Sequence, residues 1–244
     1  MLVFALLIRM RVPRYNAAMH LSIVIPALNE AENIVATLIP LQAMRSRGAE
    51  VVLADGGSTD ATRQHAAPLV DRIVESARGR ATQMNAGAKM ATGDTLLFLH
   101  ADSILPPNAD ALIGNGLKSV SRTWGRFDVT IDGQHFFLPV IAWFMNHRSR
   151  LTGIATGDQG LFMTRTAFDA AGGFTDMPLM EDVAMCVALR KTSAPLCLKK
   201  KIVTSGRRWE KHGVWRTIFL MWRLRLAYFF GADPAALHRA YYGK

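Results

Sequence analysis

A short apolar run that leads into charged residues constrains the fold of this chain more than any other feature. Residues 96–99 read Leu-Leu-Phe-Leu and continue directly into His100 and Asp102, before Pro106. An apolar run of this length between turn residues is typical of a buried strand of a parallel sheet. Ligands of open α/β sheets bind beyond the carboxyl ends of such strands, so Asp102 is a candidate for a metal or phosphate site. The pattern also fits a carboxylate that only caps a turn before Pro106.

Strand and helix patterns alternate over residues 21–103. The strands are expected at 21–26, 50–54, 71–75 and 96–99, and the helices from 29 to about 45 and over 81–91. This order predicts an α/β fold with a mainly parallel, doubly wound sheet.

The second half of the chain is less regular. Its expected elements are strands at 126–131 and 161–164, helices at 136–150 and 180–191, a helical turn at 167–171, and an amphipathic helix at 214–230. No linker rich in proline or glycine separates the halves, so we expect one domain over residues 19–244. The apolar start at 1–8 is too short for a membrane span and is followed, not preceded, by arginines. We therefore expect residues 1–18 to be an extension outside the fold.

Charge and cysteine usage limit the classes of function. The net charge is +10, and the segment from Arg190 to Arg225 holds eleven basic residues and one acid, which accounts for the whole excess. A local patch of this kind suits phosphates or an anionic membrane rather than a nucleic acid bound over the whole surface. Cys186 and Cys197 lack the spacing of a zinc site and are typical of reduced thiols in a cytoplasmic protein.

Five motifs, in a fixed order, resemble the inverting glycosyltransferases of family 2. They read IVIPALNEAENI, ADGGSTD, GDTLLFLHAD, GGF and MED, within residues 21–230. Several ordered motifs argue against a chance match more strongly than one pattern does. The segments RGRATQMNAGAKMATGD, GDQGLFM and TSGRRWEKHGVWRT resemble, more narrowly, a bacterial group associated with arsenosugar-type gene clusters.

The resemblance implies the GT-A fold and transfer of a sugar from a nucleotide donor to an acceptor hydroxyl, aided by a divalent cation, Mn²⁺ or Mg²⁺. It divides the chain into a nucleotide-binding half at 21–103, an acceptor half at 104–213 and C-terminal amphipathic helices at 214–244. Asp102 is implied as the metal ligand. The family's loop usually reads Asp-x-Asp, whereas His100 occupies the first position here, which leaves the metal preference open because imidazole suits Mn²⁺ better than Mg²⁺. The alternative for His100 is a hydrogen-bonded histidine at a strand end.

The resemblance also assigns donor contacts. Asp55 matches a position that contacts the nucleoside, although the same side chain fits a turn with Gly56. For Arg80 and Asn85 the alternative is a solvated loop. The implied donor-binding residues are Pro26, Glu30, Asp55, Arg80, Asn85, His100, Arg207 and Arg208.

Arg207, Arg208 and His212 match a loop that closes over the diphosphate in related enzymes. In this interpretation the arginines bind phosphate oxygens and His212 completes the metal shell. The alternative is a solvated basic face.

Glu181 and Asp182, at the start of a predicted helix, match the family's base motif. Inversion needs a base to take the proton of the attacking hydroxyl, which is the role implied for Asp182 with Glu181 as its neighbour. Adjacent carboxylates repel, which raises the pKa of one of them. The alternative is a favourable interaction of both acids with the helix N-terminus. Asp158 and Gln159 are expected either to bind acceptor hydroxyls or to hold a loop.

The helix expected at 214–230 has an apolar stripe that includes Trp215, Phe219 and Trp222, and a narrow basic strip of Arg216 and Arg223. This composition suits the headgroup boundary of a membrane, whereas the segment is too short and too charged to span one easily. It predicts peripheral attachment to the anionic inner face of the membrane and a lipid-linked acceptor, besides a small-molecule acceptor. The alternative is a helix that packs on its own domain.

Two other functions compete with sugar transfer. A sugar-phosphate nucleotidyltransferase has a similar sheet but a glycine-rich loop with arginine after the first strand, where this chain has Pro-Ala-Leu-Asn-Glu at 26–30. A catalytically inactive membrane-surface binding protein is the second, and the presence of both Asp102 and Asp182 speaks against it. Nucleic acid is not expected as a partner, because the tryptophans near the C-terminus follow helical spacing rather than a stacking strand.

Overall fold

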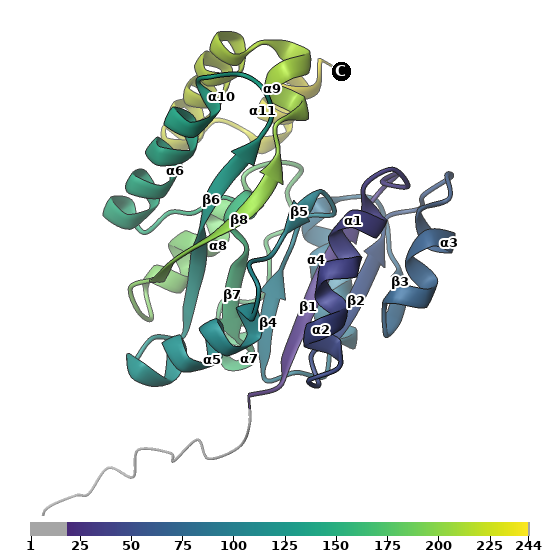
Figure 1. Cartoon of the computed structure of the whole chain (residues 1–244). Helices are drawn as coiled ribbons and strands as arrows, with labels where there is room; N and C mark the ends of the chain where they lie inside the picture. Colours follow the sequence, from purple (N-terminus) through teal and green to yellow (C-terminus); the bar gives the residue numbers. More distant parts are fainter. Residues whose placement is uncertain (1–18, 244) are drawn as a thin grey trace, which may run out of the picture.

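The computed structural model describes residues 19–243. The extension predicted for residues 1–18 lies outside this range. Within the described residues, eight strands form one sheet in the order β3-β2-β1-β4-β7-β6-β8-β5 (Figure 1). The strands are β1 (Leu21–Ala27), β2 (Glu50–Asp55), β3 (Arg72–Glu75), β4 (Thr95–Phe98), β5 (Ser103–Ile104), β6 (Trp124–Asp132), β7 (Leu161–Thr164) and β8 (Leu196–Ser205).

Helices cover both faces of the sheet and one of its ends. The α-helices are α1 (Ile34–Leu38), α2 (Gln42–Arg45), α3 (Thr62–Ala66), α4 (Arg80–Met90), α5 (Ala109–Ser119), α6 (Leu138–Thr152), α7 (Arg165–Ala170), α8 (Glu181–Arg190), α9 (Arg207–His212), α10 (Val214–Phe229) and α11 (Pro234–Tyr242). The 3-10 helices are η1 (Ile39–Leu41), η2 (Ala67–Leu69) and η3 (Gly157–Gln159).

The predicted fold class is confirmed, since β3, β2, β1 and β4 pair in parallel and β6 pairs with β8 in parallel. β7 runs antiparallel to both β4 and β6, and joins the two parallel parts. Successive side chains of a strand point to opposite faces. Ile23 and Ile25 accordingly enter the core beneath α1, α2 and α5, whereas Val24 enters the core beneath α4, α7 and α8.

α4 packs closely against β1 because position 87 is a glycine. A Cβ atom on Gly87 would collide with the Val24 side chain. This close approach brings the N-terminus of α4, with Arg80, to the carboxyl edge of the sheet, where Figure 1 shows α4 crossing behind β1 and β2.

The structure corrects several expected elements. Residues 29–45 do not form one helix, because Pro40 removes a backbone donor and the chain forms η1 between α1 and α2. α3, α5 and the short β5 were not expected from the sequence pattern. α5 begins after Asn108, which takes a left-handed conformation behind two prolines.

At the end of β6 and β8, α6, α9, α10 and α11 gather at the top of Figure 1. α6 and α10 share an apolar cluster that includes Leu138, Ile141 and Val214. A second cluster joins α10 and α11 to the loop before α8 through Leu224, Leu237 and Met180. The C-terminal helices are therefore packed against the segment that leads into Glu181 and Asp182.

Candidate active site

Asp55 ends β2 at the carboxyl edge of the parallel strands, and it is fully buried. Its Oδ2 accepts hydrogen bonds from the backbone N–H groups of Gly57 at 3.1 Å and Ser58 at 3.0 Å. Its Oδ1 has no hydrogen-bond partner among residues 19–243. Buried carboxylate oxygens are rarely left without a donor. Asp55 therefore holds its turn, and its Oδ1 can accept a further hydrogen bond.

Arg207 connects the ends of β1 and β4. Its Nη2 lies 3.4 Å from Oε2 of Glu30 and 3.6 Å from Oδ2 of Asp102. The structure thus brings together three residues that were predicted to contact the donor or its metal. Arg207 lies on a short helix, α9, and not on the expected loop. Pro26 is in β1, paired with Ala54 beside the end of β2.

His100 contacts the loop that holds Asp158. Its Nδ1 lies 3.2 Å from Oδ1 of Asp158, and its Nε2 faces Gly157 so closely that a Cβ there would collide with it. Burial raises the pKa of Asp158, but the hydrogen bond with His100 and the positive charge of Arg80 act against it, and the net effect lowers this pKa. His100 therefore has the contacts of the hydrogen-bonded strand-end histidine.

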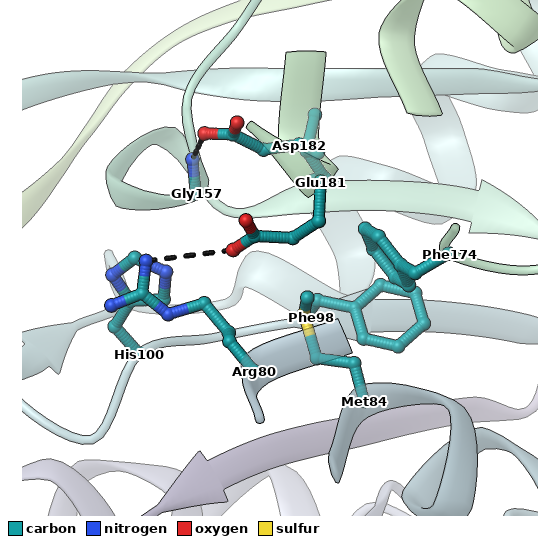
Figure 2. Close-up of a pocket in the computed structure, with 9 residues that line it drawn as sticks. Arg80, Met84, Phe98, His100, Gly157, Phe174, Glu181 and Asp182 are labelled. Atoms are coloured by element: carbon teal, nitrogen blue, oxygen red, sulfur yellow. Dashed lines mark hydrogen bonds and ion pairs between the residues drawn. The ribbon is translucent and has the colours of Figure 1, made fainter. Parts of the chain in front are cut away.

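Glu181 and Asp182 lie at the first two positions of α8, facing the cavity drawn in Figure 2. Oδ2 of Asp182 accepts the backbone N–H of Gly157 at 2.9 Å. Glu181 is 3% exposed, and its Oε1 lies 3.6 Å from Nη1 of Arg80. The other residues that line the cavity are Met84, Phe98, His100, Leu161 and Phe174.

Burial and the charge of Glu181 raise the pKa of Asp182 to about 6, although the Gly157 N–H and Arg80 act in the opposite direction. A carboxylate with a pKa in this range is ionised at neutral pH and is still basic enough to take a proton. Interaction with the helix N-terminus would lower a carboxyl pKa, so it does not account for this shift. Asp182 thus has the properties of a general base.

Met180 sets the direction in which α8 begins. Its φ is 73°, a left-handed conformation that a non-glycine residue adopts at a cost of about 1–3 kcal/mol. Its side chain is buried against Leu224 of α10 and Leu237 of α11. The C-terminal helices therefore stabilise the turn that directs Glu181 and Asp182 into the cavity. Sequence reasoning missed this contact, because nothing near Met180 in the sequence indicates it.

Few side chains of the site could hold the implied cation. No group of three His, Cys, Asp or Glu side chains suited to a metal occurs among the described residues. Mg²⁺ sites often use one or two carboxylates together with substrate phosphates, and Asp102, with 29% of its side chain exposed, fits that arrangement. His212 is exposed at the last residue of α9, whereas the contact between α9 and Asp102 comes from Arg207 at the first. Its role as a ligand stays a prediction.

Arg208 stacks over two tyrosines of the C-terminal helix. Its guanidinium carbon lies 4.2 Å from the ring centroid of Tyr241 and 5.6 Å from that of Tyr242. Burial raises the pKa of Tyr241 to about 12, and the charges of Asp158 and Arg80 also act on it. α11 therefore contributes Tyr241 to the neighbourhood of the site, which the sequence analysis did not foresee.

Two predicted ligand residues make hydrogen bonds within the protein. Asn85 donates from Nδ2 to the carbonyl of Phe174 at 2.8 Å and accepts the Phe174 N–H at 2.9 Å, so both ends of its amide are occupied. Gln159 is fully buried, and its Nε2 donates to Oγ of Ser149 at 3.0 Å. Asn85 thus binds the turn at Phe174, and Gln159 has the contacts of a residue that holds its loop, while the ligand roles of Asn85, Asp158 and Gln159 stay predictions.

The profile of the family described as "Glycosyl transferase family 2" matches residues 22–167, which is more than half of the chain. The chain belongs to glycosyl transferase family 2. A "PGL/p-HBAD biosynthesis glycosyltransferase" of Mycobacterium bovis (strain BCG / Pasteur 1173P2) is 42% identical over 96 residues, a match that covers 36% of this chain and 38% of the relative. A relative of the same name from Mycobacterium tuberculosis (strain ATCC 25177 / H37Ra) matches equally. The similarity thus spans little more than a third of these relatives.

Solved structures share the fold at low identity. TarS of S. aureus in complex with UDP has a TM-score of 0.63 at 16% identity, with 77% of this chain and 60% of that chain covered. The mannosyltransferase PcManGT from Pyrobaculum calidifontis, in complex with GDP-Man and Mn²⁺, has a TM-score of 0.63 at 18% identity, with 92% and 69% covered. The GT-A fold predicted from the motifs is confirmed. The narrower resemblance to arsenosugar-associated proteins stays a prediction.

Proposed function

We propose that this protein is an inverting, metal-dependent glycosyltransferase that moves a sugar from a nucleoside-diphosphate sugar to an acceptor hydroxyl. The observation that carries the proposal is the position of Asp182, a carboxylate with a raised pKa at the start of α8, facing a cavity beside Arg80. Membership of the family and the nucleotide complexes of the similar structures support it.

The reaction is a single displacement. The acceptor oxygen attacks the anomeric carbon while its proton passes to a carboxylate oxygen of Asp182, and the bond between the anomeric carbon and the diphosphate oxygen breaks. The electron pair of that bond leaves with the nucleoside diphosphate, so the configuration at the anomeric carbon inverts. The Gly157 N–H fixes one oxygen of Asp182, which orients the carboxylate toward the acceptor.

The donor side offsets the charge of the leaving group. Arg207 and Arg208 supply guanidinium groups that match phosphate oxygens. Asp102 would hold the divalent cation, which supplies Lewis-acid stabilisation of the leaving diphosphate when bound. Asp55 would accept a hydrogen bond from the nucleoside through its unpartnered Oδ1. Glu30 already binds Arg207, and it would keep this arginine at the end of β1.

A thermal-shift screen tests the donor class. UDP-, GDP- and dTDP-sugars are offered to the wild type with Mn²⁺ or with a chelator, and a ligand at 100 times its Kd stabilises a protein by about 2.7 kcal/mol. We expect the nucleotide sugars of one nucleoside base to raise the melting temperature of the wild type when Mn²⁺ is present. The Asp102→Asn variant should lose the part of this rise that depends on Mn²⁺. Stabilisation by a nucleoside triphosphate with sugar 1-phosphate, but by no nucleotide sugar, would instead indicate a nucleotidyltransferase.

We also propose that the face formed by α6 and α10 attaches the enzyme to the cytoplasmic side of an anionic membrane. The two helices carry large exposed side chains, with Trp143 of α6 53% exposed, and Trp222 and Phe229 of α10 70% and 81% exposed. Arg216 and Arg223 are exposed on α10, and neither helix contains an acid. Tryptophan, phenylalanine and arginine together suit the headgroup boundary. No helix among residues 19–243 is long and apolar enough to cross a membrane.

Vesicle flotation tests this attachment. We expect the wild type to float with anionic vesicles and not with neutral ones, and high salt to weaken the binding. The variant Trp143→Ser/Trp222→Ser should lose it, whereas Ile39→Ser, at an exposed apolar residue of η1, should keep it. Absence of binding to either vesicle at low salt would leave a small-molecule acceptor as the proposal and would reject the lipid-linked one.

A further inference from the structure

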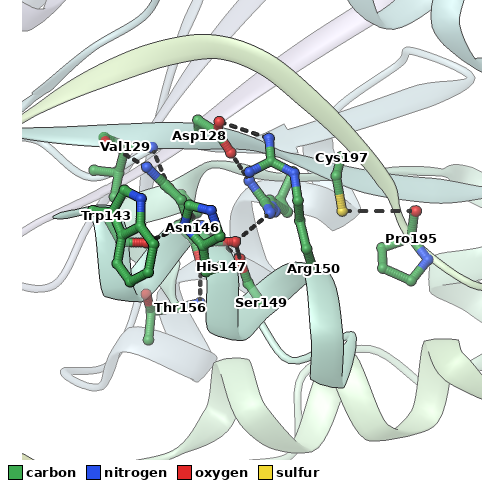
Figure 3. Close-up of polar contacts among 12 residues, drawn as sticks. Asp128, Val129, Trp143, Asn146, His147, Ser149, Arg150, Thr156, Pro195 and Cys197 are labelled. Atoms are coloured by element: carbon green, nitrogen blue, oxygen red, sulfur yellow. Dashed lines mark hydrogen bonds and ion pairs between the residues drawn. The ribbon is translucent and has the colours of Figure 1, made fainter. Parts of the chain in front are cut away.

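Two arginines share one carboxylate between β6 and α6, and a third arginine, Arg148, lies on the same helix. Arg126, which is fully buried, pairs with Asp128 through Nη1 and donates from Nη2 to the carbonyl of Asn146 at 3.0 Å. Arg150 reaches the same Asp128 at 2.7 Å, as Figure 3 shows. Arg148, between Asn146 and Arg150 in the sequence, completes the set. The cluster therefore has more positive than negative charge, with Arg126 fully buried and Arg148 and Arg150 partly buried.

Several N–H groups of this cluster lack an acceptor. The Nε of Arg126 and both Nε and Nη2 of Arg148 are shielded from solvent and have no hydrogen-bond partner among residues 19–243. Asp128 is occupied by Arg126 and Arg150, so it does not serve Arg148. An unpaired guanidinium in a low-dielectric region is costly. Burial accordingly lowers the pKa of Arg148, against the opposing charge of Asp182.

Arg148 lies on α6, which contacts the turn that binds Asp182. Nε2 of Gln159 in η3 donates to Oγ of Ser149 in α6 at 3.0 Å, and the Gly157 N–H of η3 donates to Asp182. The acids whose charges favour its protonated form are Asp182 and Asp158, and Cys186 of α8 is also near it. Its unpartnered Nε and Nη2 belong to one edge of the planar guanidinium. That edge matches two oxygens of a carboxylate or a phosphate in a bidentate contact. Asp182 and Asp158 each have other partners, Gly157 and His100, so neither satisfies this edge.

We propose that Arg148 binds an anionic group of the acceptor, a phosphate or a carboxylate, and thereby places the acceptor hydroxyl at Asp182. The proposal rests on the function proposed for Asp182, because it takes the acceptor side from that residue. Two oxygens of the anion would accept the Nε and Nη2 hydrogen bonds that the protein leaves unmet. The acceptor is therefore an anionic alcohol rather than a neutral one.

Anion binding tests the proposal without a known acceptor. The full chain is saturated with the nucleoside diphosphate and Mn²⁺ found in the donor screen, so that the donor site is occupied, and inorganic phosphate or malonate is titrated while the melting temperature is followed. We expect one of these probes to stabilise the wild type and to bind Arg148→Gln about 10- to 100-fold more weakly, the range of charged hydrogen bonds. Phosphate and malonate distinguish the two classes of anion.

Arg122→Gln is the matched control, since Arg122 lies in the turn before β6 and outside the cluster. Equal stabilisation of wild type and Arg148→Gln, or none of either by both anions, would overturn the proposal. If no nucleotide binds, that result counts against the proposed function and not against the role of Arg148. The anion is then titrated into the protein without nucleotide, and the same comparison of wild type and Arg148→Gln decides the proposal.

Arg148→Met removes the unpaired charge and keeps a side chain of similar length. If Arg148 awaits an anion, this variant should melt at the same temperature as the wild type or higher when no anion is present, and it should lose the response to the anion. A large fall in its melting temperature would show that Arg148 stabilises the fold, and would contradict the proposal.

Discussion

The parallel strands β1, β2 and β4 and the part of the protein built around β6, α6 and α8 use buried groups in opposite ways. In the first region the middles of the strands are apolar and the buried polar side chains lie near strand ends, with Ser22, Glu50 and Thr95 where strands begin and Asp55 where β2 ends, and Asp102 follows β4. In the second, Arg126 and Glu181 are charged side chains inside the protein. In the first region the topology of the sheet places the polar side chains at one edge. In the second region, contacts between segments distant in the sequence place them.

This difference divides the proposed site into a donor side, which depends on the sheet topology, and an acceptor side, which depends on contacts particular to this chain. A nucleotide site at strand ends is available to many sequences with the same sheet. The proposed acceptor side draws on groups from three separate elements: Gly157 of η3, Asp182 of α8 and Arg148 of α6. Substitutions in the two regions should therefore affect different steps of the reaction.

The largest effect is expected for Asp182→Asn. This change keeps the shape but removes the base, so kcat should fall by about 10²- to 10⁴-fold while the Kd of the donor stays the same. Steady-state rates of nucleoside diphosphate release and donor titration measure the two quantities. Asp169→Asn, at an exposed residue of α7, is the control. A variant that lost donor binding as well would show that the two regions are not separable.

Gly157→Ala should act on the acceptor side without unfolding the protein. Its Cβ would collide with Nε2 of His100 and displace the N–H that binds Asp182. Misplacement of a catalytic group by about 1 Å can cost about 10²-fold in rate. We expect a loss of this order in kcat. Gly114→Ala in α5, where the Cβ meets only Met19 at ordinary contact distance, should keep full activity. Normal turnover in Gly157→Ala would argue against the orienting role of the loop.

Asp55→Asn should act on the donor side alone. The amide can still accept from the turn, but its NH₂ would face the donor group that the unpartnered oxygen of Asp55 is expected to bind. The loss of one charged hydrogen bond corresponds to about 10-fold in donor affinity. Calorimetric titration of the nucleoside diphosphate measures it. An unchanged Kd would reduce Asp55 to its role in the turn.

Glu181→Gln should shift the pH profile and is expected to have the smallest effect on the maximal rate. Asp182 must be ionised to act, so kcat falls as the pH drops through its pKa of about 6. Removal of the charge of Glu181 lowers that pKa, so the acid limb should move to lower pH. Glu32→Gln, at an exposed residue, should leave the limb in place. An acid limb that moved to higher pH would contradict this coupling.

The sequence predicted most of the first region and only part of the second. Asp102 and Asp55 could be placed because a buried strand followed by turn residues fixes where the side chain emerges. The helix start at Glu181 could be placed from its acids. The internal hydrogen bonds of Asn85 and Gln159 could not be predicted, because an amide that binds a ligand and one that binds the protein look alike in sequence.

Arg148 and the contact of Met180 with α11 leave no periodic signal, since both depend on segments far apart in the chain. A signal existed for Arg126 and Asp128, which lie two residues apart on one face of an apolar strand. A charged pair in such a position indicates a buried ion pair. What surrounds that pair follows only from the packing of α6 against β6, which the sequence pattern does not fix.

The configuration of the first sugar product tests inversion at the anomeric carbon most directly. Many glycosyltransferases slowly transfer to water, so the donor identified by the screen is incubated with enzyme and Mn²⁺, and the released sugar is followed by ¹H NMR before it mutarotates. An α-linked donor should give the β-anomer first, and Asp182→Asn should abolish the signal. Initial release of the α-anomer by the wild type would contradict a single displacement with Asp182 as the base.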